Sequence, residues 1–194
     1  MVQQLYLIRH GETAWSQSGQ HTGRTDIPLT ARGEAQARRA GERLRELQFT
    51  AVLTSPLQRA RRTCELAGLN APAQVDEALR EWDYGQYEGL TSAEIRQRQR
   101  RWDVFRDGCP GGETPPEVSA RADGVLERLR QLDGCVAVFS HGHFLRSLAV
   151  RWVGLPILHG RNFGLSAGAV CMLGYEHQSL DEPAIELWNA GTGA

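Results

Sequence analysis

The chain has 194 residues, of which 41% are hydrophobic and 23% are charged, values that are typical of a soluble globular protein. This length is enough to bury a hydrophobic core, so we expect a single domain over residues 1–194. The formal net charge of -1 provides no overall positive field for nucleic acid or an anionic membrane. The composition therefore predicts no nucleic-acid or membrane partner, and any site for an anion must be built locally.

The cysteines and the N-terminus both indicate a cytoplasmic protein. The four cysteines are scattered and form no C-x-x-C pair, so they predict reduced structural thiols rather than a zinc site or a redox motif. Residues 1–4 lack the character of a leader sequence, and no stretch has the apolar length that a membrane span needs.

The first predicted strand ends in a polar loop. Leu5–Ile8 is a short apolar run, typical of a buried strand, and it stops at residues 9–11, Arg-His-Gly. Further along, Thr30 can cap a helix whose apolar residues recur at helical spacing as far as Leu47.

A second strand is expected to lead directly into a helix. Ala51–Thr54 predicts the strand, and Ser55 is a good N-cap for a helix over Leu57–Ala67. Pro56 suits the first helical position, because its missing N–H is not needed there.

The remainder of the chain predicts further helices and strands around irregular loops. A short strand near Val75 and a polar, aromatic loop over residues 79–85 come first. The other predicted elements are helices over Thr91–Arg101 and Pro115–Leu132, a strand over Cys135–Ser140, a helix toward Val153, and strands over Ala169–Tyr175 and Ile185–Trp188. Alternating strands and helices predict an α/β fold, a three-layer α/β/α sandwich with a mostly parallel sheet.

Three predicted strands end in residues that suit a phosphate site. Arg9 and His10 follow the first strand, Ser55 and nearby Arg59 follow the second, and His141 follows a later one. Ligands bind at the carboxyl ends of the strands in such sheets, so we expect these side chains to meet. Two imidazoles and two guanidinium groups form a compact cationic pocket, whose natural ligand is a tetrahedral dianion such as phosphate.

The same residues predict phosphoryl transfer. A neutral imidazole is a competent nucleophile, and nearby Arg cations should lower the pKa of His10 so that its attacking nitrogen stays unprotonated. A leaving alkoxide needs a proton. Residues 79–89, here called the acid loop, offer Glu81, Asp83 and Glu88 as its source.

Several segments resemble one family in order along nearly the whole chain. Leu7–Thr13 resembles the signature of the histidine phosphatase superfamily, which includes the cofactor-dependent phosphoglycerate mutases. The other matching segments are Thr22–Thr30, Ser55–Ala60, Leu79–Glu81, Tyr84–Gly89 and Ser140–His143. The resemblance implies a phosphoglycerate mutase-like fold and a metal-independent hydrolase that needs no cofactor.

The resemblance also implies roles for individual residues. His10 would be the phosphorylated nucleophile. Glu81 would protonate the leaving oxygen and then accept a proton from the water that attacks phosphohistidine. Arg9, Arg59 and His141 would surround the phosphate.

Three further residues are assigned to the substrate by the resemblance. Thr22 and Gly23 match the segment that lines the substrate entrance, and they are expected to offer backbone N–H groups. Ser16 falls where many relatives carry Asn, so a hydroxyl replaces an amide beside the phosphate. His143 is not expected to bind a metal with His141, because no acidic or histidine cluster completes a ligand set.

Three functions remain open from the sequence. Attack on phosphorylated His10 by water makes a phosphatase, and attack by a hydroxyl of a bound phosphorylated intermediate makes a mutase. Glycolytic mutases of the family carry an inserted segment where Arg101–Gly108 is short here, which favours the phosphatase. Residues 81–89 and 102–114 resemble the fungal sedoheptulose-bisphosphatase branch, which implies a sugar phosphate as substrate. A non-catalytic phosphate-binding domain is disfavoured, because both His10 and Glu81 are retained.

Other polar residues are expected to have structural or surface roles. Asp83 and Glu88 are predicted to be structural or solvated, and Arg62 is predicted to pair with a surface acid. Three histidines are expected in surface or loop positions: His21, His159 and His177. No pattern in the chain indicates an oligomeric state.

Overall fold

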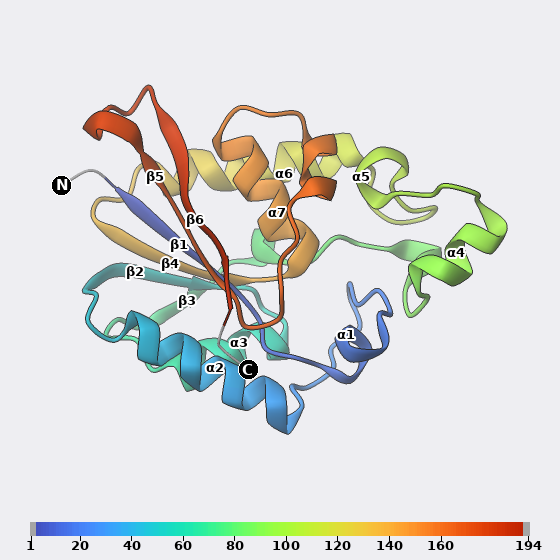
Figure 1. Cartoon of the computed structure of the whole chain (residues 1–194), viewed down its shortest axis with the longest axis horizontal. Coiled ribbons are helices and arrows are strands. Elements are labelled where there is room, and N and C mark those ends of the chain that lie inside the picture. Colours follow the sequence, from blue (N-terminus) through green and yellow to red (C-terminus); the bar gives the residue numbers. More distant parts are fainter. Residues whose placement is uncertain (1–2, 192–194) are drawn as a thin grey trace.

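The computed structural model describes residues 3–191, which form a six-stranded sheet with helices on both faces (Figure 1). The strands are β1 (Gln4–Arg9), β2 (Phe49–Thr54), β3 (Ala73–Val75), β4 (Cys135–Ser140), β5 (Val170–Tyr175) and β6 (Pro183–Ala190). Their order is β3-β2-β4-β1-β5-β6. The pairs among β1 to β4 are parallel, and β5 pairs antiparallel with both β1 and β6. The prediction of a mostly parallel sheet is confirmed.

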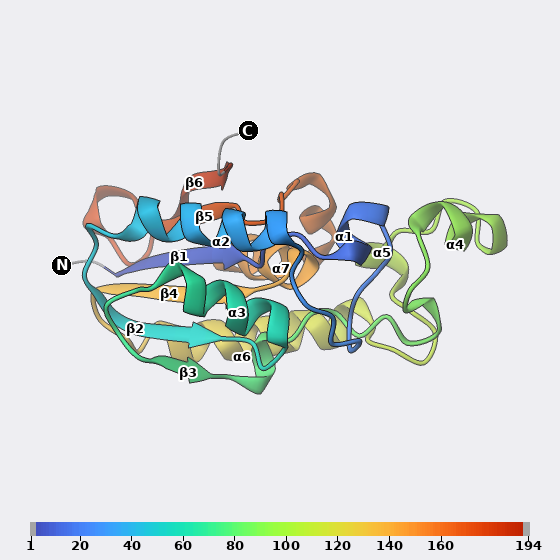
Figure 2. The ribbon, with the colours of Figure 1, turned by 90° about the horizontal axis from the view of Figure 1, so that it is seen from below.

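Two pairs of helices make the outer layers (Figure 2). On one face lie α2 (Ala31–Leu44) and α3 (Gln58–Ala67), and on the other lie α6 (Pro115–Leu129) and α7 (Gly142–Trp152). The shorter elements are α1 (Ala14–Ser18), α4 (Ser92–Arg98), α5 (Val104–Asp107) and the 3-10 helices η1 (Glu77–Leu79), η2 (Gly85–Tyr87), η3 (Ile157–Asn162) and η4 (Glu176–Gln178). Within residues 3–191, none of the helices is long and apolar enough to cross a bilayer.

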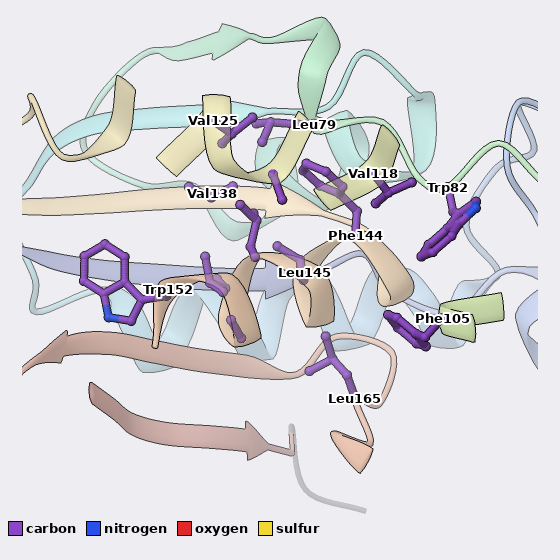
Figure 3. Close-up of a cluster of buried hydrophobic side chains, with 14 of the residues drawn as sticks. Leu79, Trp82, Phe105, Val118, Val125, Val138, Phe144, Leu145, Trp152 and Leu165 are labelled. Carbon is purple, nitrogen blue, oxygen red and sulfur yellow. The ribbon is translucent and has the colours of Figure 1, made fainter. Parts of the chain in front are cut away.

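The sheet lies between two hydrophobic clusters. Leu5 and Leu7 of β1 belong to the larger cluster beneath α6 and α7, whereas Tyr6 and Ile8 belong to the cluster beneath α2 and α3. Successive side chains of a strand point to opposite faces, so one apolar run supplies both cores. Figure 3 shows part of the larger cluster, including Val138, Leu145 and Trp152.

The helix after β2 begins later than the sequence predicts. α3 starts at Gln58, and Leu57 has an extended backbone with φ -70° and ψ 134°. Ser55 Oγ accepts the N–H of Leu57 at 3.3 Å and also lies 2.7 Å from the Nε2 atom of His141. Ser55 therefore bonds to His141, the residue that follows β4, and does not cap the helix.

Other predicted boundaries also differ, and α6, for example, ends at Leu129 and not at Leu132. α4 ends at Arg98 and not at Arg101, because Gln99 is extended and Arg101 has the left-handed φ of 64°. The last strand, Pro183–Ala190, is longer than its apolar residues 185–188 predict, because backbone pairing with β5 extends beyond them.

Candidate active site

The carboxyl ends of β1, β2 and β4 bring the expected side chains together. Arg9 ends β1, His10 follows it, Ser55 follows β2 and His141 follows β4. The N–H of His10 donates to the Ser140 carbonyl at 3.0 Å, which continues the β1–β4 pairing into the loops. The ring centroids of His10 and His141 lie 5.2 Å apart. The expected convergence is therefore present.

The hydrogen bonding of His10 determines which ring nitrogen is free. Its Nδ1 atom lies 2.7 Å from the carbonyl oxygen of Gly11. A carbonyl oxygen only accepts, so Nδ1 carries the hydrogen and Nε2 keeps its lone pair. Burial lowers the pKa of His10 well below 6.5, and the Arg59 and Arg9 cations lower it further. The ring therefore has the unprotonated nitrogen that a nucleophile needs.

Close backbone packing holds the turn after His10. A Cβ atom at Gly11 would lie 2.2 Å from the carbonyl oxygen of Gly33 in α2, so a larger residue would force the two segments apart. The N–H of Gly11 donates to Thr63 Oγ1 at 3.1 Å, and this hydroxyl donates to the Arg59 carbonyl at 2.7 Å. The turn is thus tied to both α2 and α3.

Arg59 is fully buried and orients His141. Its Nε–H donates to His141 Nδ1 at 3.2 Å, so Nε2 of the neutral ring carries the hydrogen and donates to Ser55 Oγ at 2.7 Å. Burial lowers the pKa of His141 well below 6.5, and the Arg59 cation adds to this effect. The terminal nitrogens of Arg59 donate at 2.9 Å to the carbonyls of Thr22, Gly23 and Thr25.

Arg9 offers a buried donor that has no partner among the described residues. One terminal nitrogen donates to the Leu165 carbonyl, but the buried Nε–H is unpaired. The guanidinium lies against Gly142, where a Cβ atom would be 3.3 Å from both Cζ and Nε. Burial lowers the pKa of Arg9, and the Glu81 carboxylate opposes that effect. A buried unpaired donor is unfavourable until a ligand accepts from it, so Arg9 is suited to an anion.

The carboxylate of Glu81 lies at the first turn of α7. Oε2 accepts the N–H of His143 at 3.0 Å, and Oε1 accepts the N–H groups of Phe144 and Trp82, each at 2.9 Å. The N-terminal N–H groups of a helix have no partner within the helix, and a carboxylate satisfies them favourably. Three backbone donors therefore hold this side chain.

One cavity joins these groups. Five of the eight residues that the sequence assigns to the site line a cavity of about 150 Å³: Arg9, His10, Ser16, Thr22 and Glu81. Arg59 and His141 are fully buried next to His10 and do not line it. A phosphoryl group in this cavity would meet an imidazole, a guanidinium group and a carboxyl group.

Comparison with known proteins agrees with this geometry. Residues 5–191 match the model of the histidine phosphatase superfamily (branch 1). The chain belongs to this superfamily. An acid phosphatase of Mycobacterium tuberculosis is 44% identical over 179 residues, which cover 89% of this chain and 87% of that protein. A sedoheptulose 1,7-bisphosphatase of Saccharomyces cerevisiae is 34% identical over 245 residues, with coverages of 93% and 90%. The solved structure of an open reading frame product from M. tuberculosis has a TM-score of 0.90 and 40% identity, and covers 98% of this chain and 99% of that one.

Gly23 departs from the role that resemblance to histidine phosphatases implies. Its N–H, which was expected to bond to a substrate, donates to both carboxylate oxygens of Glu88, at 2.9 and 3.1 Å. The N–H of Thr25 donates to the same carboxylate at 3.0 Å. A Cβ atom at Gly23 would lie 2.6 Å from the Trp82 carbonyl oxygen, so the glycine permits close packing of two loops. Glu88 has the structural role that the sequence predicts.

Ser16 lines the cavity, but its hydroxyl is already bonded. Oγ accepts the N–H of Thr13 at 2.8 Å and donates to the Thr13 carbonyl at 3.0 Å. Thr13 Oγ1 in turn accepts the N–H of Ser16 at 3.2 Å, which completes a capping box. The Ser16 hydroxyl, which stands where the resemblance led us to expect an amide, therefore helps to cap α1.

Eight residues of the cavity wall were not assigned to the site from the sequence, and they include His21, Tyr84, His143 and Arg146. The Tyr84 hydroxyl lies 2.6 Å from His143 Nδ1, and the His21 ring stacks on Tyr84 with centroids 4.8 Å apart. His21 lies in a loop as predicted, but its ring is packed and not free in solvent. Burial lowers the pKa of His21 to about 4 and that of His143 well below 6.5.

Helical spacing is a signal that could have identified two of them. His143 and Arg146 lie three residues apart at the start of α7, so they share the face that His141 leads into. The Nε–H of Arg146 donates to the Gly160 carbonyl at 2.8 Å, and its guanidinium carbon lies 4.7 Å from the centroid of Phe105. These contacts hold the Arg146 cation at the cavity.

Asp83 and Glu34 are each paired with an arginine. Asp83 pairs with Arg24 at 2.6 Å. Arg62 pairs with Glu34 at 3.1 Å on the surface, as the sequence predicts. In the part of the chain that the structure describes, no group of three or more His, Cys, Asp or Glu side chains is placed to hold a metal ion.

Proposed function

We propose that this chain is a phosphomonoesterase that hydrolyses a small phosphorylated metabolite, a sugar phosphate, through a phosphohistidine on His10. The observation that carries the proposal is the state of the His10 ring, whose Nδ1 is committed to Gly11 while Nε2 keeps its lone pair. The same cavity is lined by Arg9 and Glu81. Membership of the histidine phosphatase superfamily supports this reaction.

In the first step, Nε2 of His10 attacks phosphorus, and the bond from phosphorus to the ester oxygen breaks in line. Glu81 in its acid form donates a proton to the departing oxygen, so the substrate leaves as an alcohol. Arg9 donates to the non-bridging oxygens. The buried Arg59 cation adds positive charge as charge moves onto these oxygens, and His141 accepts from the Nε–H of Arg59 and holds that side chain beside His10.

In the second step, water attacks the phosphorus of phosphohistidine. Glu81, now a carboxylate, accepts a proton from that water, and the bond from nitrogen to phosphorus breaks. Inorganic phosphate is released. His10 returns to its neutral form with Nε2 free, and Glu81 returns to its acid form.

A sugar phosphate is supported by the named relatives and by the cavity wall. Two relatives are an acid phosphatase and a sedoheptulose 1,7-bisphosphatase. Beyond the nucleophile, the wall includes Tyr84, His143 and Arg146, which are polar groups able to bind the hydroxyls of a sugar.

We also propose a domain organisation, a compartment and a class of partner for the enzyme. It acts as a single domain in the cytoplasm on a small phosphorylated substrate, without nucleic acid or a membrane as partner. The four free cysteines support a reducing compartment.

A phosphate-release screen tests the function. The panel comprises sugar monophosphates and bisphosphates, nucleotides, phosphopeptides, and 3-phosphoglycerate with a bisphosphorylated primer. We expect inorganic phosphate chiefly from sugar phosphates, with acid-labile phosphate on the protein in rapid-quench samples. Isomerisation of 3-phosphoglycerate with little phosphate release would instead make the chain a mutase. Binding of phosphate without turnover of any ester would make it a non-catalytic domain.

A further inference from the structure

All three nitrogens of the Arg121 guanidinium in α6 donate hydrogen bonds, to backbone carbonyls at the acid loop and to the carboxylate of Glu113. Its Nη1 group donates to the carbonyls of Ala78 and Arg80, at 2.9 and 2.8 Å. Its Nη2 group donates to the carbonyl of Glu81 at 3.4 Å. The remaining donors go to the Glu113 carboxylate, Nε at 2.8 Å and Nη2 at 2.7 Å. One guanidinium therefore holds the chain just before and at Glu81.

Glu113 bonds to the residues that follow Glu81. Its Oε2 atom accepts the N–H of Asp83 at 2.9 Å, and its backbone N–H donates to the Asp83 carbonyl at 2.9 Å. Its carbonyl accepts the indole N–H of Trp82 at 2.9 Å. The Arg121–Glu113 pair therefore forms hydrogen bonds with the acid loop on both sides of Glu81.

The same pair also contacts the helix end that holds the Glu81 carboxylate. The Arg121 guanidinium carbon lies 4.1 Å from the ring centroid of Phe144, which is labelled in Figure 3. The N–H of Phe144 donates to Glu81 Oε1 at 2.9 Å. Backbone and carboxylate of Glu81 are therefore both placed by groups that Arg121 touches.

We propose that Arg121 and Glu113 are positioning residues for the acid–base chemistry of Glu81. The inference builds on the role proposed for Glu81 above. Neither residue lines the cavity that contains His10, so neither contacts the phosphoryl group. Their effect is geometric, because proton transfer requires the carboxyl group within hydrogen-bond reach of the leaving oxygen.

A second ion pair, which joins α6 and α7, provides a matched control. Arg151 of α7 binds Asp123 of α6 with two contacts, Nε to Oδ1 at 2.7 Å and Nη2 to Oδ2 at 3.0 Å. Its Nη1 group donates to the Leu155 carbonyl at 3.1 Å. The side chains of Arg151 and Arg121 are 28% and 19% exposed, so the two arginines are both largely buried. None of the contacts of Arg151 reaches the acid loop.

The experiment compares Arg121→Lys with Arg151→Lys. Lysine keeps the charge but has one nitrogen, so it cannot bond Glu113 and three carbonyls together. For each variant, kcat/KM is measured with para-nitrophenyl phosphate, whose leaving group needs little protonation, and with a hydrolysed sugar phosphate, whose leaving group needs a proton. Because kcat/KM reports the first irreversible step, slow hydrolysis of phosphohistidine does not mask the comparison.

We expect Arg121→Lys to lower kcat/KM for the sugar phosphate about 10- to 100-fold more than for para-nitrophenyl phosphate. Arg151→Lys should lower both by the same factor. An equal loss on both esters in Arg121→Lys, as in the control, would overturn the inference. If Arg121→Lys does not fold, Glu113→Gln is used in its place, because the amide has one acceptor oxygen and cannot replace both carboxylate oxygens that bond to Arg121 and Asp83.

Glu81→Gln separates the two levels of the proposal. It should show the strongest dependence on the leaving group. If Glu81→Gln shows this dependence and Arg121→Lys does not, only the positioning role is wrong. If Glu81→Gln slows both esters equally, Glu81 is not the acid, and the positioning role fails with it.

Discussion

The two halves of the candidate site are held in different ways. Backbone pairing between β1 and β4 places His10 and His141, so the half that accepts the phosphoryl group continues the sheet. Glu81 lies opposite in an irregular loop, held by N–H groups of α7 and by the Arg121–Glu113 pair. Strand pairing involves many backbone groups, whereas the loop depends on a few side chains. A single substitution outside the cavity should therefore disturb the acid more easily than the nucleophile.

We expect the largest loss of activity from a substitution in the part of the site that the sheet positions. His10→Ala removes the nucleophile and should lower phosphate release from para-nitrophenyl phosphate by about 10⁴-fold or more. The fold should be retained, because strand pairing is made by the backbone; circular dichroism provides the control. Turnover within tenfold of the wild type would show that His10 is not the nucleophile.

We expect the next largest loss of activity from a substitution in the acid loop, at Glu81. Glu81→Gln cannot donate the acid proton and should slow a sugar phosphate by about 10²–10³-fold. It also cannot accept a proton from water, so rapid-quench experiments with para-nitrophenyl phosphate should show accumulated phosphohistidine. A variant that turns over without accumulation would argue for another proton acceptor.

Ser55→Ala tests how strictly the sheet half is organised. The change removes the acceptor of the His141 Nε2–H, and an unpaired buried donor lowers the free energy of unfolding by about 1–3 kcal/mol. Thermal denaturation should show a fall of about 2–4 °C per kcal/mol. The matched variant Ser18→Ala, at an exposed hydroxyl, should leave the melting temperature unchanged.

Stability should also depend on pH through the imidazoles of the site. The pKa values of His10, His21, His141 and His143 are all lowered by burial, that of His21 to about 4. Between pH 6.5 and 4, unfolded histidines bind protons that the folded protein excludes, so the stability present above pH 6.5 falls as the pH falls. The loss is on the order of 1 kcal/mol for each pKa unit of each group.

Melting temperatures measured from pH 7 to pH 4 check this expectation. His21→Phe keeps an aromatic ring against Tyr84 and removes one titrating group, so it should reduce the slope over this range. An identical slope in that variant would mean that His21 does not contribute.

The smallest effect is expected from metal removal. The proposed reaction uses a histidine nucleophile, guanidinium groups and a carboxyl group, so dialysis against EDTA should leave kcat and KM unchanged. A loss of activity that zinc or magnesium restores would require a different mechanism for both halves of the site.

The sequence predicts the sheet half of the site well, because its signals are local. Apolar runs followed by Arg9-His10 and by His141 predict strands whose carboxyl ends carry reactive side chains. Parallel strands bring their carboxyl ends to the same edge of the sheet. Even the free nitrogen of His10 follows from a neighbour in sequence, the Gly11 carbonyl. The resemblance added Glu81, which periodicity could not single out among three acidic residues.

Tertiary structure alone decided the partners in the loop half. Gly23 donates to Glu88 across 65 positions, and Tyr84 meets His143 across 59. The contacts of Arg121 likewise join α6 to carbonyls in a distant loop. Hydrogen-bond partners in irregular segments depend on how distant surfaces pack, whereas apolar periodicity reports only which face of a strand or helix is buried. The sequence therefore determined the layers and the position of the proposed nucleophile, His10, and packing determined what surrounds the proposed acid, Glu81.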